Sequence, residues 1–386
     1  MVTEFARSLF LKDRRQTRGA VPPVDTSTHP SGYSSSALRQ DGRDGVLWSP
    51  LWHIRIELTA LERALLQTWP VRRLCFLHHN GASVFAYPLN TSRLQHTIGV
   101  LALVSHFCPD RDDLRAAALL HDVGHYPFCH SAELVPGVDH HAMTRRRVTS
   151  EPLSDLLIVY GQDPRHVLAL MDGTPSNPLR THNGLLHLDH LDSWVRLAQA
   201  AGYARCSADE LLSRLRLENH NVAASEETAE YLVWLIRKGN ERHYAEGDIG
   251  PACVLAYVVM LALERGLLTM EEFAAATDEE LLARLAVAGD EGITKLVMLL
   301  RKEPWRISVS RTADGEIRSS GPATTTLILA GQPELDNTIA VRLRGLYDAV
   351  PLLAGTGQPI TRTSPGARAE LAKVKTLPGT FTVTWR

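Results

Sequence analysis

The segment LRAAALLHDVGHYPFCH, residues 114–130, constrains the fold and the chemistry of this chain more than any other. Its first seven positions are mostly apolar and predict a buried helix, at whose end His121 and Asp122 lie together. His125 follows one helical turn after His121, and His130 comes just beyond the proline that breaks the helix. Imidazoles and a carboxylate at the end of a buried helix are expected to converge on one cavity, as metal binding or acid–base catalysis requires.

Two other segments carry residues that could complete such a site. His96 opens the apolar helix predicted for RLQHTIGVLALV, and LDHLDSWVR places Asp189 and Asp192 in a further helix. Two histidines and two aspartates from separate helices would hold one divalent metal and leave positions open for water and a phosphate oxygen. The candidate ligands are His96, His121 and Asp122, together with Asp189 or Asp192. This ligand set leaves the metal open among Mn, Fe, Ni, Co, Zn and Mg.

Each of these residues also has a structural interpretation. A His-Asp dipeptide by itself is usually a surface or capping pair, and His96 alone is more often a core or surface histidine. Asp189 and Asp192 lie three positions apart, as on the solvated face of an amphipathic helix. The order and spacing of the whole set favour the metal site over these alternatives.

The apolar pattern predicts a mainly α protein. Apolar residues recur at helical spacing from about Leu51 to about Leu300, and Thr59, Ser207 and Thr277 are plausible N-caps because glutamate follows each within a turn. After Trp305 the segments RISVSR, ATTTLILA and FTVTW are rich in β-branched residues, as short strands are. We therefore predict a flexible leader over residues 1–47, a helical domain over 48–300 and a small, mixed or β-rich lobe over 301–386.

Composition narrows the setting in which the protein works. The formal net charge of −2 gives no overall attraction to nucleic acid or to an anionic membrane. The apolar runs 98–104 and 254–263 are far shorter than the roughly 20 residues that span a bilayer, and the N-terminus has no signal-peptide pattern. The five cysteines are scattered and form no CxxC, which argues against a disulfide framework or a structural zinc site. We expect a cytoplasmic protein with no membrane partner.

The runs Arg93–Val100, His121–His130 and Leu188–Asp192 resemble the HD-domain phosphohydrolases, and most closely their deoxynucleoside triphosphate triphosphohydrolase (dNTPase) branch. The similarity extends from about Leu51 to about Leu285. The resemblance implies an HD-domain helical bundle and homo-oligomerisation. It also implies that the metal ligands are His96, His121, Asp122 and Asp189. The roles that it implies for other residues are catalytic or phosphate-contacting for His125, His130 and His141, orienting for Glu133, and phosphate-binding for Arg93.

The sequence departs from that family where substrate is held. His79 stands where the family usually has glutamine, and Ala142 where it has glutamate. Further along, His190, Ser193 and Leu197 replace the usual lysine, tyrosine and aspartate. A site that keeps its metal ligands but changes its sugar contacts should keep the reaction and alter the substrate. A modified nucleotide, a nucleoside monophosphate or another phosphate ester would suit the changed pocket.

A later basic and aromatic group, within WLIRKGNERHY, could also reach the pocket, or could be a solvated helix end. From it Arg237 and Tyr244 join Arg93, His79 and His190 as predicted substrate-binding residues.

The leading interpretation is an enzyme that cleaves a phosphate ester or anhydride of a nucleotide with metal-activated water and a histidine general acid. One alternative is a catalytically reduced HD protein that binds a nucleotide for regulation. Another is an HD-type nuclease, for which nucleic acid would be the partner. The low net charge disfavours a nuclease, although the run Arg145–Arg147 keeps that interpretation open. The sequence contains no GxGxxG, GxxxxGK[ST], HExxH or GxSxG motif.

Overall fold

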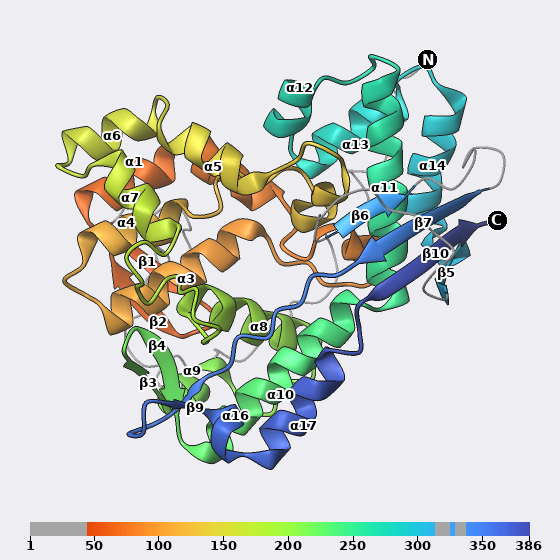
Figure 1. Cartoon of the computed structure of the whole chain (residues 1–386). Helices are drawn as coiled ribbons and strands as arrows, with labels where there is room; N and C mark the ends of the chain where they lie inside the picture. The colour runs from red at the N-terminus through yellow and green to blue at the C-terminus, as the bar shows by residue number, and fades with distance from the viewer. Residues whose placement is uncertain (1–44, 313–324, 329–336) are drawn as a thin grey trace, which may run out of the picture.

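The computed structural model describes residues 45–312, 325–328 and 337–386 (Figure 1). These residues are mainly helical, with three small sheets among the helices, as the sequence predicted. The α-helices are α1 (Ala60–Gln67), α2 (Trp69–Arg72), α3 (Arg93–Phe107), α4 (Asp112–Leu120), α5 (His140–Val148), α6 (Leu153–Val159), α7 (Pro164–Met171), α8 (Leu188–Ala200), α9 (Ala208–Leu212), α10 (Glu226–His243), α11 (Glu246–Glu264), α12 (Met270–Ala275), α13 (Asp278–Ala286), α14 (Glu291–Lys302), α16 (Ile360–Thr363) and α17 (Pro365–Val374). The 3-10 helices are η3 (Arg73–Phe76), η4 (Gly81–Phe85), η5 (Cys129–Leu134) and η6 (Pro304–Arg306).

Side-chain caps fix where several helices begin. Thr59 and Thr277 each form a capping box with the glutamate three residues later in the sequence. The Ser207 hydroxyl accepts a hydrogen bond from the Glu210 N–H. All three predicted N-caps are therefore confirmed. Ser92, which the sequence analysis did not identify, forms a capping box with Gln95 and starts α3. Each cap contributes about 0.5–2 kcal/mol, so the start of the helix that carries His96 is well defined.

Helix α3 lies at the centre of the helical domain, packed between α4 and α8 (Figure 1). Most of its residues are buried, and it has no polar face, which is typical of an interior helix. Helix α4 buries all its residues from Leu114 to Leu120. Because these helices pack on one another along their apolar sides, the polar residues at the start of α3, the end of α4 and the start of α8 come together.

A second core forms around α11, which packs against α14, η5 and the C-terminal sheet. Among the described helices, only α11 is long and apolar enough to cross a membrane, and 67% of its most apolar stretch is buried in the fold. The apolar run 254–263 is thus part of a longer helix, which continues through Pro251. Its burial is what an interior helix of a folded domain requires.

The strands form three sheets. They are β1 (Val46–Ser49), β2 (Ile54–Glu57), β3 (Leu215–Glu218), β4 (Asn221–Ala224), β5 (Ile307–Thr312), β6 (Thr325–Ile328), β7 (Thr338–Leu343), β8 (Leu352–Leu353), β9 (Gln358–Pro359) and β10 (Gly379–Trp385). The sheet orders are β1-β2, β5-β10-β7-β6 and β3-β4-β8-β9. Among the strands of the described residues, only β4 and β8 pair in parallel. The antiparallel register of β10 places Val383 opposite Val309 and Ile339.

The C-terminal residues do not all stay in the β-rich lobe that the sequence predicted over 301–386. β5, β6, β7 and β10 form its sheet, but β8 pairs with β4 and α17 packs on α10. Residues 344–351, which we call the strap, cross from one region to the other, and Figure 1 shows them passing in front of α8. The C-terminal segment therefore covers part of the helical domain. Of the predicted leader, residues 1–44 lie outside the described residues, and Val46 already belongs to β1.

Candidate functional site

The four predicted metal ligands converge from three helices. His96 on α3 and His121 at the end of α4 bring their Nε2 atoms to 3.3 Å from each other. Asp189 on α8 places Oδ1 at 3.2 Å from His96 Nε2 and 3.7 Å from His121 Nε2. Asp122 Oδ2 lies 3.6 Å and 3.5 Å from the same two nitrogens. All four donor atoms therefore face one small volume, which we call the HD cluster.

The other ring nitrogens of both histidines already have acceptors. His96 Nδ1 lies 2.8 Å from Asp192 Oδ2, and His121 Nδ1 lies 2.8 Å from the Ala118 carbonyl oxygen. These acceptors assign the N–H to Nδ1 and leave the Nε2 lone pairs directed toward each other and toward two carboxylates. Such a donor set suits a divalent cation, because lone pairs and carboxylates at these separations repel one another unless a positive charge lies between them.

The electrostatics of the cluster agree with this interpretation. Burial alone would lower the pKa of His121, but the carboxylates of Asp122 and Asp189 outweigh it and raise that pKa to about 9. Burial opposes ionisation of Asp122 and Asp189 as well, yet the neighbouring imidazoles and, for Asp122, the Arg93 guanidinium hold both carboxyl pKa values well below their ordinary range. The cluster thus stabilises positive charge at its centre.

Asp192 is the residue that orients His96. Its fully buried carboxylate accepts hydrogen bonds from Trp52 Nε1 at 2.7 Å and from Arg196 Nε and Nη2 at 2.8 and 3.0 Å, besides the contact with His96. A Cβ at position 99 would lie 1.9 Å from Asp192 Oδ1, so the close approach requires Gly99. The helix predicted from the sequence carried both Asp189 and Asp192 as candidates. The structure places Asp189 in the HD cluster and Asp192 behind His96.

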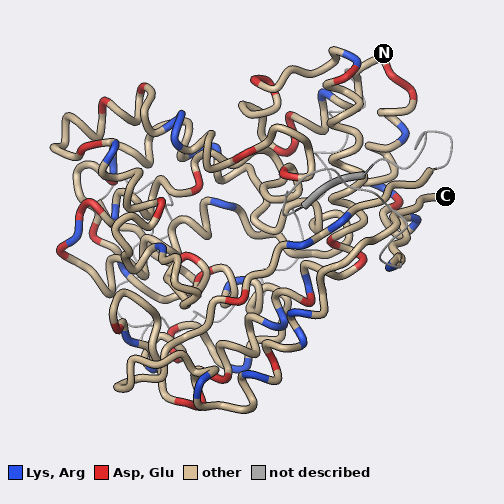
Figure 2. The backbone as a smooth tube through the Cα atoms, viewed as in Figure 1, with Lys and Arg blue, Asp and Glu red and all other residues tan. Residues whose placement is uncertain are grey.

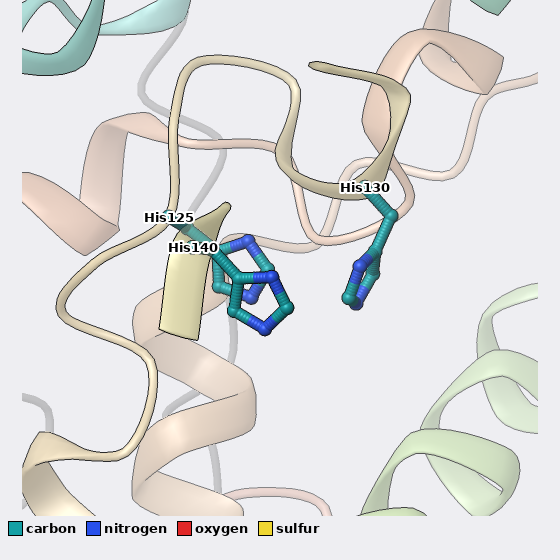
Figure 3. Close-up of side chains that lie close together, drawn as sticks. All are labelled: His125, His130 and His140. Atoms are coloured by element: carbon teal, nitrogen blue, oxygen red, sulfur yellow. The ribbon is translucent and has the colours of Figure 1, made fainter. Parts of the chain in front are cut away.

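A second group of imidazoles lies beside the HD cluster. His125, His130 and His140 bring ring nitrogens within 4.8 Å of one another, and we call them the histidine triad (Figure 3). The rings of His125 and His140 stack at 4.3 Å between centroids, and His130 meets His125 edge-on at 4.8 Å. Asp122 joins the two groups, because its Oδ1 lies 3.2 Å from His125 Nε2 while its Oδ2 faces His96 and His121.

Glu133 orients two members of the triad. Its Oε1 lies 3.1 Å from His130 Nδ1 and also contacts His140 Nδ1. His125, in contrast, is buried, and burial followed by the charges of Arg93 and His140 lowers its pKa well below the ordinary value. The triad thus combines a neutral buried imidazole with a half-exposed one, His130, whose tautomer a carboxylate fixes.

The structure places His140, rather than the predicted His141, in the triad. His141 lies beside it, with ring centroids 3.9 Å apart, and burial followed by the charge of His140 lowers its pKa to about 4. The pair begins α5, where successive side chains point about 100° apart, so only one of them can face His125. Two adjacent histidines give no sequence signal that distinguishes them, and Asp139, the N-cap of α5, was the available clue to the helix start.

The loop that carries the triad is held by a residue that sequence reasoning missed. Phe128 and Cys129 have positive φ angles of 57° and 49°, a conformation that costs about 1–3 kcal/mol for such residues. Buried Asp278, at the start of α13, accepts from the Phe128 N–H through Oδ1 at 2.7 Å and from the His78 N–H through Oδ2 at 2.7 Å. Arg73 donates to the His125 carbonyl oxygen at 2.8 Å. These contacts stabilise the strained loop.

Three of the predicted substrate-binding residues lie at the site. Arg93 is buried and donates to Asp122 Oδ2 at 3.1 Å, to Cys129 Sγ at 3.2 Å and to the His79 carbonyl oxygen at 3.0 Å. The His79 ring lies 4.6 Å from that of His96. His190 directly follows Asp189, a predicted metal ligand, and its ring lies 4.1 Å from that of His187 between centroids.

The other two predicted substrate-binding residues contact different parts of the fold. Arg237 forms ion pairs with Glu241 on its own helix and with Glu370 on α17, so its guanidinium joins α10 to α17 instead of reaching the clusters. The Tyr244 hydroxyl donates to the carbonyl oxygen of Gly345 at 2.7 Å and thereby holds the strap. The sequence did not indicate the contact of Arg237 with Glu370 or that of Tyr244 with Gly345, because Glu370 and Gly345 both belong to the distant C-terminal segment.

Charge is mixed over the surface. Figure 2 shows blue Lys and Arg positions interspersed with red Asp and Glu positions along the whole described backbone. The Arg145–Arg147 run is partly engaged inside the protein, since Arg147 donates to the carbonyl oxygens of Val123 and Ala274. This arrangement gives no support to a continuous basic groove for a polyanion.

Residues 93–168 match the HD domain family. A segment of 101 residues is 30% identical to an uncharacterized protein of Methanocaldococcus jannaschii and covers 25% of this chain and 22% of that protein. A segment of 128 residues is 30% identical to an uncharacterized protein of Mycoplasma pneumoniae and covers 28% of this chain and 30% of that protein. The matches thus span less than a third of these relatives' lengths.

Two solved structures share the fold over most of the chain. A phosphohydrolase from Bacteroides thetaiotaomicron superposes with a TM-score of 0.66 at 14% identity, covering 88% of this chain and 99% of that one. A hypothetical protein from Aquifex aeolicus superposes with a TM-score of 0.59 at 15% identity, covering 87% and 95%. The residues that match the HD domain family therefore lie within a fold that extends well beyond residues 93–168.

Proposed function

We propose that this HD-domain protein is a metal-dependent phosphohydrolase that cleaves a phosphate ester or anhydride of a nucleotide. The observation that carries the proposal is the position of Asp122, whose two carboxylate oxygens face the HD cluster on one side and His125 of the histidine triad on the other. A cation-binding group directly beside a proton-transferring group is what hydrolysis of a phosphate requires.

His96, His121, Asp122 and Asp189 would hold the metal. A divalent ion bound there would supply positive charge to the phosphate oxygens and lower the pKa of a water molecule. Arg93 supplies a fixed positive charge in the interior of the site, next to Asp122. That guanidinium stabilises negative charge that develops on phosphate oxygens during the reaction.

The histidine triad moves protons. Glu133 accepts from His130 Nδ1, so Nε2 of that ring is the atom that would donate a proton to the leaving group from the doubly protonated imidazolium form. His125 stays neutral, because burial lowers its pKa, and orients the polar groups around Asp122. His140 stacks on His125 and shares the Glu133 carboxylate, which keeps the three rings in one arrangement.

The nucleotide part of the proposal rests on the dNTPase-like motifs, and the substituted positions His79 and His190 favour an altered substrate rather than ordinary dNTPs. The test is a phosphate-release screen of purified protein with Mn, Fe, Ni, Co, Zn or Mg against ribo- and deoxynucleoside mono-, di- and triphosphates. Activity should fall by at least a hundredfold in His130→Ala and vanish in Asp122→Ala. The matched control is His166→Ala, whose exposed imidazole lies on α7.

Two outcomes of the same screen would contradict the proposal. If no metal supports turnover while Asp122→Ala binds nucleotide as tightly as wild type, the protein is the regulatory binder that the sequence also allowed. If labelled DNA or RNA strands are degraded and free nucleotides are not, the nuclease interpretation holds.

Homo-oligomerisation and a cytoplasmic location stay predictions. Sedimentation of the full chain would test the first, and imaging would test the second.

A further inference from the structure

The strap brings a tyrosine next to the HD cluster. The Tyr347 ring meets the His190 ring edge-on, with centroids 5.5 Å apart at 89°, and the Trp194 ring at 5.8 Å and 71°. His190 directly follows the predicted metal ligand Asp189 on α8. Tyr347 lies far outside the matched residues 93–168, so nothing in that family match points to it.

Asn240 of α10 and Tyr244, the residue directly after that helix, fix the strap in this position. The buried side chain of Asn240 donates from Nδ2 to the Tyr347 carbonyl oxygen at 2.8 Å and accepts from the Tyr347 N–H at 3.2 Å. Tyr244 donates to the carbonyl oxygen of Gly345 at 2.7 Å. A two-point contact from a buried amide holds the backbone of Tyr347 against both translation and rotation. The tyrosine is therefore pre-positioned beside the cluster.

The Tyr347 phenol is partly exposed and lies close enough to Glu133 and Asp189 for their charges to act on it. The residue is 37% exposed, yet burial is the largest cause that raises its phenol pKa to about 12, followed by the charge of Glu133. Part of the side chain is therefore accessible to a bound molecule. Among the described residues, no hydrogen-bond partner is found for its hydroxyl, which remains protonated and able to donate at neutral pH.

We infer that Tyr347 is a specificity-determining residue that donates a hydrogen bond to a hydroxyl-bearing, sugar-like leaving group of the substrate, and that Asn240 is its positioning residue. The inference rests on the proposed phosphohydrolase function. The ring that packs on His190 and Trp194 supplies a flat apolar wall, and the hydroxyl supplies the donor. A hydroxyl held in a fixed position favours leaving groups that can accept its hydrogen bond over those that cannot.

The experiment compares two substrates in wild type and Tyr347→Phe, which removes only the hydroxyl. For the best nucleotide found in the screen, kcat/KM should fall about threefold to tenfold, the effect of one hydrogen bond. For p-nitrophenyl phosphate, whose leaving group has no sugar hydroxyl, kcat/KM should stay within about twofold. Tyr160→Phe, at an exposed tyrosine just beyond α6, is the matched control and should change neither value.

Asn240→Asp separates positioning from a general loss of structure. The variant keeps an acceptor for the Tyr347 N–H and loses the donor to its carbonyl oxygen. It should raise KM for the nucleotide with little change in kcat, while p-nitrophenyl phosphate hydrolysis stays as in wild type. A loss that is equal for both substrates would mean that the strap is merely structural.

The two proposals can fail separately. If wild type hydrolyses nucleotides and Tyr347→Phe shows the same substrate ratio as wild type, the assignment of Tyr347 is overturned and the phosphohydrolase proposal stands. If wild type turns over no nucleotide, calorimetric titration of a nucleoside monophosphate into the metal-loaded protein replaces turnover. A weaker affinity in Tyr347→Phe then supports the contact, and equal affinity, or no binding by wild type, overturns it.

Discussion

The Asp278 carboxylate accepts a hydrogen bond from the N–H of Phe128, at 2.7 Å and 150 positions away in sequence. Its second oxygen accepts from the His78 N–H at 2.7 Å and lies 2.6 Å from His78 Nδ1, and this hydrogen bond raises the pKa of His78. One buried side chain thus joins α13 to the loop that carries the histidine triad.

Asp278→Ala should destabilise the protein by about 3–5 kcal/mol, because it leaves buried N–H groups without acceptors and the left-handed Phe128 without support. Denaturation by urea measures the change. The neighbouring Glu279→Ala is the control, since the Glu279 side chain is 69% exposed and forms an ion pair with Arg301 at the surface. Equal stability of the two variants would show that Asp278 does not hold the loop.

Gly99→Ala should weaken metal binding about tenfold to a hundredfold. The new Cβ would lie 1.9 Å from Asp192 Oδ1, so that carboxylate must move and His96 loses the acceptor that orients it. Calorimetric titration of Mn into metal-free protein measures the affinity. Gly292→Ala, within α14, is the matched control because its nearest neighbour lies 3.3 Å away. Wild-type affinity in Gly99→Ala would argue against an orienting role for Asp192.

His140→Ala and His141→Ala distinguish the two adjacent histidines. His140 belongs to the triad and contacts Glu133, so its loss should reduce kcat by about 10²–10⁴. His141 lies beside the triad, and its loss should reduce kcat by less than tenfold. Steady-state rates on the best substrate decide between them. If His141→Ala reduces kcat more than His140→Ala does, His141 has the catalytic role that the sequence predicted.

Metal binding should stabilise the fold measurably, whether or not a substrate is known. A cation held between α3, α4 and α8 binds the folded state alone, so a concentration of 100 Kd should add about 2.7 kcal/mol. The expected result is a rise in Tm when Mn is added to chelator-treated protein. His121→Ala should lose that rise and His166→Ala should keep it. A Tm that is insensitive to every divalent ion would contradict the site.

His141 should make stability depend on pH. Burial followed by the charge of His140 lowers its pKa in the folded state to about 4 from 6.5, so the unfolded chain binds the proton more tightly. Its contribution is therefore complete above about pH 6.5 and is lost as the pH falls toward 4. His141→Gln should therefore reduce the rise in urea midpoint between pH 4.5 and 7. If the urea midpoint of His141→Gln rises with pH as steeply as that of wild type, His141 is not a source of the pH dependence.

Much of the fold and the HD cluster could be predicted because the relevant signals are local. Apolar periodicity marks the helices, and Thr59 and Thr277 cap their helices through hydrogen bonds that span three positions. His121 and Asp122 end an apolar helix, so their placement at a buried helix terminus follows from the sequence around them. These features depend on backbone geometry within a few residues, which the order of amino acids specifies directly.

The remaining features depend on which distant segment packs against which face. Asp189 and Asp192 fit the helical pattern of α8 equally well. The position of α3 brings Asp189 into the HD cluster and Asp192 behind His96. Arg237 pairs with α17 and Tyr347 crosses over α8 because the C-terminal segment folds back onto the helical domain. The periodicity of apolar residues defines the faces of each helix but does not indicate which other segment packs on each face. The positions of these residues were therefore decided by tertiary packing alone.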